Sequence, residues 1–121
     1  MGADLYLMRK KETCRTMWLE RSEEAVRKGY FRDPYNSLSV LCKYELSWWS
    51  DIGELLDANG VISVGNAQRL LAMLEERDSL FAANIKDESA DRRTELIKAA
   101  DLLKQFLRDA IELDSPIAAW L

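Results

Sequence analysis

The sequence contains few residues that interrupt a helix, with two prolines and five glycines among its 121 residues. Proline has no amide proton to donate, and glycine loses the most conformational entropy on folding, so both are disfavoured inside helices. Turn-forming residues separate long segments with helical hydrophobic periodicity. This spacing predicts four helices, at residues 12–28, 37–57, 63–85 and 88–113.

Short connections between helices of this length favour antiparallel neighbours. We therefore expect an all-α fold, an antiparallel four-helix bundle that residues 1–121 form as a single helical domain. The first residues, MGADLYL, alternate loosely between polar and apolar and predict a short extended N-terminal segment. The β-branched stretch VISV at 61–64 is a candidate partner for residues 3–7.

The composition excludes several classes of protein. A hydrophobic fraction of 48% and a charged fraction of 31% are typical of a globular chain. A formal net charge of -4 gives no electrostatic reason to bind nucleic acid or an anionic membrane. No apolar run approaches the roughly 18 residues of a membrane span. We expect a cytoplasmic protein with no nucleic-acid or membrane partner.

The residue types that build common catalytic and metal sites are also scarce. The chain has no histidine, which excludes histidine-dependent triads and histidine metal ligands. Its two cysteines, Cys14 and Cys42, have neither the spacing of a metal site nor the density of a disulfide scaffold. We therefore assign no catalytic residue, no metal ligand and no cofactor.

Three charged residues fall on the apolar sides of the predicted helices. In a helical projection of residues 37–57, Glu45 lies near the centre of a broad apolar arc that includes Trp48. Arg21 and Arg77 lie inside the apolar sides of the first and third helices. The lengths of the turns bring all three to one layer of the bundle, and the helix that carries Glu45 should be the most buried.

We therefore expect a semi-buried cluster of Arg21, Glu45 and Arg77. An unpaired carboxylate in the core would cost several kcal/mol or become protonated, whereas two guanidinium groups can satisfy both of its oxygens. In the structural interpretation the cluster only fixes the register of the helices, because buried ion clusters serve structure more often than chemistry. The alternative is a charged floor for a ligand pocket, which would make the chain a small-molecule or nucleotide-binding protein.

The segment GYFRDPYN at 29–36 gathers aromatic and charged side chains in one predicted loop. Tyrosine and arginine provide much of the contact energy of protein interfaces. The candidate partner-binding residues are Tyr30, Phe31, Arg32, Asp33 and Tyr35. In the structural alternative, Tyr30 and Phe31 staple the corner between two helices, and Arg32 pairs with Asp33.

Two carboxylate pairs offer an enzymatic alternative. Glu20 with Glu23, and Glu54 with Asp57, are similar to the ExxE and ExxD motifs of all-α nucleotide pyrophosphohydrolases of the MazG kind. Carboxylates three residues apart share one side of a helix and can hold Mg²⁺ together. The same ExxD spacing also occurs at 75–78 and 88–91, which is expected by chance in a chain with 21 acidic residues.

Three stretches together resemble a group of small bacterial and phage proteins that have no assigned activity. They are MGADLY at 1–6, YFRDPYN with LSWW in the middle, and AIELDSPI at 110–117. The resemblance implies a compact domain and, by analogy with small phage proteins, a role in occupying a host protein's surface. We therefore expect a non-enzymatic protein-binding module, a phage-borne inhibitor or adaptor of a host protein.

Overall fold

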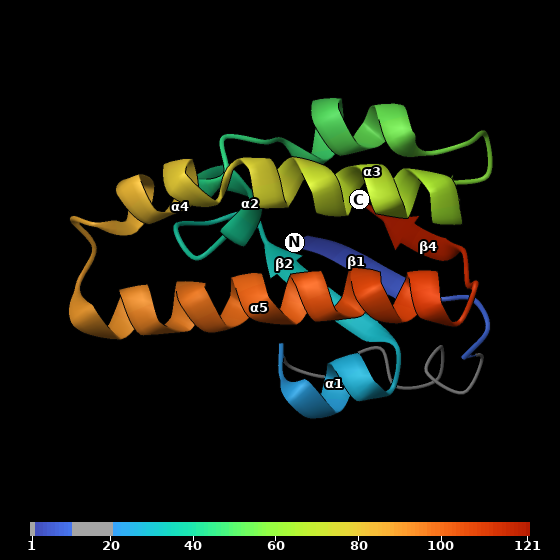
Figure 1. Cartoon of the computed structure of the whole chain (residues 1–121), viewed down its shortest axis with the longest axis horizontal. Coiled ribbons are helices and arrows are strands. Elements are labelled where there is room, and N and C mark those ends of the chain that lie inside the picture. The colour runs from blue at the N-terminus through green and yellow to red at the C-terminus, as the bar shows by residue number, and fades with distance from the viewer. Residues whose placement is uncertain (1, 11–20) are drawn as a thin grey trace.

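The computed structural model describes residues 2–10 and 21–121, and it has a mixed α/β fold. Four strands form one antiparallel sheet in the order β2-β1-β4-β3, and helices pack against it (Figure 1). The strands are β1 (Gly2–Leu7), β2 (Tyr30–Pro34), β3 (Val61–Ile62) and β4 (Ile117–Trp120). The predicted all-α four-helix bundle is therefore wrong.

The first and last strands pair along the centre of the sheet. β1 lies between β2 and β4, and Leu5 faces Phe31 on one side and Ala119 on the other. Side chains alternate between the faces of a strand, so Ala3, Leu5 and Leu7 point together into the core, where all three are fully buried. The predicted extended segment at the start of the chain is thus the centre of the sheet. The predicted partner of residues 3–7 is wrong, because β3 pairs with β4.

The helices after residue 63 follow their hydrophobic periodicity. They are α3 (Val64–Glu76), α4 (Asp78–Ile85) and α5 (Ala90–Glu112). Ser63 accepts a hydrogen bond from the Asn66 amide, and Ser89 accepts one from the Arg92 amide, as expected of N-caps. The predicted helices at 63–85 and 88–113 are confirmed, apart from a break at Arg77. Within the described ranges, no helix is both long and apolar enough for a bilayer crossing.

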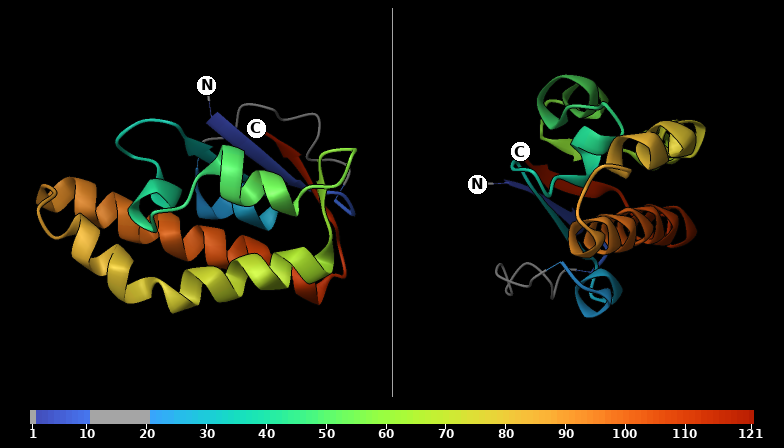
Figure 2. Two further views of the ribbon diagram at one scale, coloured as in Figure 1. Left: turned by 90° about the horizontal axis from the view of Figure 1, so that it is seen from above. Right: turned by 90° about the vertical axis from the view of Figure 1, so that its left-hand side faces the viewer.

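Helices α3 and α5 lie side by side on one face of the sheet (Figures 1 and 2). Phe106 of α5 meets Phe31 of β2 with ring centroids 6.3 Å apart, so the longest helix and the sheet share one core. Helix α1 (Glu23–Arg27) lies on the other side of α5 from α3. It ends before Gly29, whose φ of 82° ends a helix without steric cost. The rest of the predicted first helix, at 12–20, lies outside the described residues.

The segment 37–57 is the one most changed from its prediction. Helix α2 (Val40–Lys43) is only one turn long and ends in a Schellman motif, in which the Leu46 amide donates to the Leu41 carbonyl. Glu45 adopts the left-handed conformation that this motif requires, with a φ of 56°. A π-helical turn η2 (Trp48–Ile52) and a 3₁₀ turn η3 (Gly53–Leu55) follow. There is no long second helix to be the most buried element.

Candidate functional site

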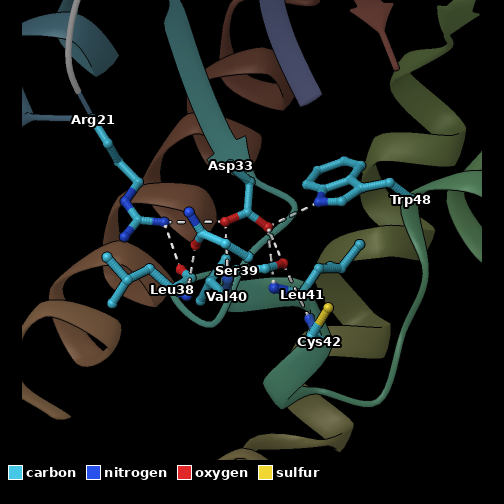
Figure 3. Close-up of polar contacts among 9 residues, drawn as sticks. Arg21, Asp33, Leu38, Ser39, Val40, Leu41, Cys42 and Trp48 are labelled. Carbon is cyan, nitrogen blue, oxygen red and sulfur yellow. Dashed lines mark hydrogen bonds and ion pairs between the residues drawn. The ribbon is translucent and has the colours of Figure 1, made fainter. Parts of the chain in front are cut away.

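The most connected side chain among the described residues is the carboxylate of Asp33, at the end of β2. It points into the core and is fully buried. Each of its oxygens accepts hydrogen bonds (Figure 3). The donors are the amides of Val40 (2.9 Å) and Leu41 (3.2 Å), Ser39 Oγ (3.0 Å), Trp48 Nε1 (2.8 Å) and Arg21 Nη1 (3.0 Å). We call Asp33 and these five partners the Asp33 hub.

The donors to Asp33 come from three separate segments, at Arg21, at residues 39–41 and at Trp48. Asp33 receives the first free amides of α2, which places its carboxylate at the positive end of that helix. Arg21 also donates to the Leu38 carbonyl at 3.2 Å, so it holds the turn before α2 as well as the carboxylate. Burial raises the pKa of Asp33, and the hydrogen bonds from Val40, Trp48, Leu41 and Ser39 act in the opposite direction. Because these donors hold the Asp33 carboxylate within the fold, the hub is a structural centre.

A pair of exposed aromatic rings lies next to the hub in sequence. Tyr35 comes two residues after Asp33, and Trp49 directly follows Trp48. Their rings stack with centroids 6.4 Å apart and an interplanar angle of 26°. Tyr35 is 36% exposed and Trp49 is 66% exposed, in contrast to Trp48, which is buried. We call Tyr35 and Trp49 the aromatic platform.

The backbone that carries Trp49 is fixed by a reciprocal cap. Ser47 Oγ accepts hydrogen bonds from the amides of Trp49 (3.2 Å) and Ser50 (3.3 Å). In return, Asp51 Oδ2 accepts a hydrogen bond from the Ser47 amide at 2.7 Å. This arrangement resembles a capping box and satisfies the free amides at the start of η2. Trp49 therefore lies on an ordered turn, next in sequence to Trp48, which is anchored to Asp33.

The predicted partner-binding residues do not form one exposed surface. Tyr30 and Phe31 are fully buried, and Asp33 is the centre of the hub. Arg32 is partly buried and makes two hydrogen bonds to Asp4, at 2.8 and 2.9 Å. The expected pair of Arg32 and Asp33 is absent because consecutive residues of β2 point to opposite faces of the sheet. Of the predicted set, Tyr35 is the member with an exposed ring.

The predicted cluster of Arg21, Glu45 and Arg77 is not formed. Glu45 is exposed, and its carboxylate accepts a hydrogen bond from Asn84 Nδ2 at 3.1 Å. Arg77 donates to the backbone carbonyls of Tyr44 and Glu45, at 3.1 and 3.4 Å, while Arg21 binds Asp33. The helical projection fails because α2 ends at Lys43. A buried carboxylate held by Arg21 does exist, but it belongs to Asp33.

The described members of the carboxylate pairs proposed for magnesium do not form a metal site. Glu20 lies outside the described residues, and Glu23 is on α1, on the other side of α5 from Glu54 and Asp57 (Figures 1 and 2). Asp57 Oδ1 instead accepts the amides of Asn59 and Val61, at 2.8 and 3.0 Å, and so orders the turn before β3. Within residues 2–10 and 21–121, no group of three acidic or cysteine side chains could hold a metal ion.

The sequence reasoning overlooked Trp49 as a surface residue and Trp48 as the partner of Asp33. The signal is the tandem WW at 48–49, because adjacent residues of a regular element point in different directions. The two rings therefore point in different directions, which makes one of them a candidate for the surface. Comparison of the chain with models of protein families, with curated proteins and with solved structures found no match.

Proposed function

We propose that this chain is a non-enzymatic protein-binding module and that the Tyr35–Trp49 platform is its main contact surface. The observation that supports this proposal is a stacked pair of exposed aromatic residues, of which Trp49 is 66% exposed and lies on a capped turn. Tryptophan and tyrosine are the residues most enriched among the energetic centres of protein interfaces. Exposing a tryptophan to water forgoes free energy that burial in the core would provide.

The anchoring of the platform supports the same proposal. Trp48 and Asp33, the neighbours of the two platform residues, are held in the hub by a hydrogen bond of 2.8 Å. Rings on an ordered backbone lose little conformational freedom when a partner binds, which favours affinity. The other members of the predicted set act through the fold: Asp33 anchors Trp48, Tyr30 and Phe31 are buried, and Arg32 is paired with Asp4.

The partner that we propose is a protein. The resemblance to small bacterial and phage proteins suggests a host protein, with this chain as a phage-borne inhibitor or adaptor that acts in the cytoplasm. The comparisons give no independent information on the partner. Experiments on this chain can test the platform before any partner is identified.

The test compares two variants in a quantitative capture from bacterial lysate. Trp49→Ser with Tyr35→Ser removes the platform, and Trp120→Ser removes an exposed tryptophan from β4, where the ring is 68% exposed. We expect a saturable, stoichiometric partner to be lost with the platform variant and retained with the Trp120 variant. Thermal unfolding of both variants checks that neither change disrupts the fold.

Two outcomes would contradict the proposal. Retention of the same partner by the folded platform variant would show that the contact lies elsewhere. Equal loss of the partner with Trp120→Ser would show that the capture depends on general surface hydrophobicity. Magnesium-dependent hydrolysis of a nucleoside triphosphate by the purified chain would instead support an enzyme.

A further inference from the structure

The charge of the chain is unevenly distributed around the platform. Residues 44–68 contain four acidic residues and no lysine or arginine, and this stretch includes Trp49, η2 and η3. The whole chain has 17 basic and 21 acidic residues, a formal net charge of -4. The rest of the chain is therefore balanced, and its whole excess of negative charge lies in this stretch. The four acids are Glu45, Asp51, Glu54 and Asp57.

These four carboxylates are not neutralised within the described part of the chain. None of them takes part in an ion pair there, whereas Asp33, Asp4, Asp78 and Glu88 each have a basic partner. Glu45, Glu54 and Asp57 are exposed, and Asp51 is partly exposed. The stretch thus presents to solvent carboxylates that form no ion pair among the described residues, and the Arg77 guanidinium that contacts it binds the backbone carbonyls of Tyr44 and Glu45.

Trp49 and Glu54 are both exposed residues of this stretch. Trp48, Ile52 and Leu55 are buried, so they define the side that faces the core. Trp49 and Glu54 are exposed and face the solvent. Figure 1 shows these turns as the green coils beside α3, at the surface of the molecule. A partner that covers the Trp49 ring would therefore approach a stretch whose only charged residues are acidic.

We infer that the partner presents a basic protein surface and that one of its arginine side chains stacks on the Trp49 ring. This inference rests on the proposed function and adds the chemistry of the partner to it. A guanidinium group is attracted to the face of an aromatic ring, most strongly to tryptophan, and it also stacks in a planar manner. The neighbouring carboxylates add a Coulomb attraction for the same cation and steer its approach.

The same charges argue against a second copy of this chain on the platform. A symmetric dimer through this surface would bring two stretches of the same negative charge together. Like charges in one interface cost free energy unless basic groups separate them. Residues 44–68 contain no basic residue that could do so.

The test uses short synthetic peptides as probes, with the full chain labelled with ¹⁵N. Four capped nonapeptides alternate glycine with arginine, lysine, glutamate or proline, and the indole N–H signal of Trp49 reports contact with the platform. We expect the arginine peptide to shift this signal most, the lysine peptide less, and the glutamate and proline peptides not at all. The affinity for the arginine peptide should fall as salt is raised from 50 to 300 mM.

A matched pair of charge variants isolates the acidic stretch. Glu45→Gln with Glu54→Gln removes two of its charges, and Glu95→Gln with Glu112→Gln removes two exposed carboxylates from α5. We expect the first double variant to weaken binding of the arginine peptide about three-fold or more, and the second to weaken it less than half as much. Equal weakening by both would show that only the net charge of the chain matters, and it would overturn the inference.

The remaining outcomes separate this inference from the proposed function. If the proline peptide shifts the Trp49 signal as strongly as the arginine peptide, the platform binds but the partner is not basic. If no peptide shifts the signal at millimolar concentration, the basic-partner inference is overturned. In that case the capture experiment with Trp49→Ser and Tyr35→Ser decides whether the platform binds any protein.

Discussion

Two members of the Asp33 hub, Asp33 and Trp48, lie on the same two short segments as the aromatic platform, but the hub and the platform differ in almost every physical property. The hub is buried, charged and fully bonded, whereas the platform is exposed and mostly apolar. Asp33 and Tyr35 are two residues apart, and Trp48 and Trp49 are adjacent. Each segment therefore directs one side chain inward to hold the fold and another outward to solvent.

The contrast suggests how a small domain can hold a binding surface rigid. The buried residues, Asp33 and Trp48, fix the backbone of their segments. The exposed residues, Tyr35 and Trp49, are held in place by that backbone and contribute little to stability. Changes at the hub should therefore affect the folding free energy, and changes at the platform should affect binding alone. Each prediction below tests one side of this division.

The largest effect is expected for Asp33→Asn. The amide keeps the shape of the carboxylate, but its nitrogen would face hydrogen-bond donors, and Arg21 would lose its counter-ion. We expect a loss of about 3 kcal/mol or more in the free energy of unfolding, measured in urea. Asp87→Asn, at an exposed turn, is the matched control and should change stability by less than about 0.5 kcal/mol. Similar effects for both would contradict the hub.

Arg21→Met tests the charged part of the hub separately. The methionine fills much of the space of the arginine stem but donates to neither Asp33 nor the Leu38 carbonyl. We expect a loss of about 2 kcal/mol in urea unfolding, smaller than for Asp33→Asn because the other four donors to Asp33 remain. A loss below about 0.5 kcal/mol would show that the ion pair contributes little.

Glu45→Gly should stabilise the protein. Glu45 lies between the hub and η2 and has a φ of 56°, a conformation that costs a non-glycine residue about 1 kcal/mol. Glycine removes this cost, although it also removes the hydrogen bond from Asn84 to the Glu45 carboxylate. We expect a gain of about 0.5–1 kcal/mol in urea unfolding. A loss would show that the bond to Asn84 outweighs the backbone strain.

The stability of the protein at alkaline pH should depend on two buried tyrosines, Tyr30 and Tyr44. Burial raises the pKa of Tyr30 and Tyr44, and the neighbouring carboxylates of Asp4 and Asp78 raise it further. The folded state therefore holds the phenolic proton more tightly than the unfolded state, in which tyrosine has a pKa near 10. This contribution to the free energy of unfolding is present below pH 10 and is lost as the pH rises further. Unfolding in urea between pH 9 and 11 should show a decline that is reduced in Tyr30→Phe. A decline of equal size in this variant would contradict the prediction.

The sequence predicted the second half of the fold better than the first. Ser63 and Ser89 cap long amphipathic helices whose hydrophobic periodicity continues for several turns, so α3, α4 and α5 could be located. The end of α2 could not, because Glu45 occupies a left-handed position where glycine is usual. Local composition favoured continuation of the helix, and the turn is instead held by distant contacts from Arg77 and Asn84.

The sheet and the candidate site were missed for a related reason. In β2, the alternation of inward and outward residues is hidden because the inward residue Asp33 is charged. Its burial is possible because donors from three separate segments converge on it, which no local pattern reveals. β4 contains two alanines and pairs with strands more than 50 residues away, so its neighbours could not be inferred from periodicity. The tandem tryptophans at 48–49 can be seen in the sequence, but the sequence does not distinguish the buried one from the exposed one.

The central claim is that adjacent residues serve the fold and the surface separately, and Trp48 and Trp49 test it most directly. The measurement is the free energy of unfolding in urea for Trp48→Ala and Trp49→Ala, followed by circular dichroism. We predict a loss of about 3 kcal/mol or more for Trp48→Ala, because the change leaves a cavity and removes a donor from Asp33. For Trp49→Ala we predict a loss below about 1 kcal/mol, the contribution of its stack with Tyr35. Comparable losses for the two variants would contradict the account, because the platform would then be part of the structural core.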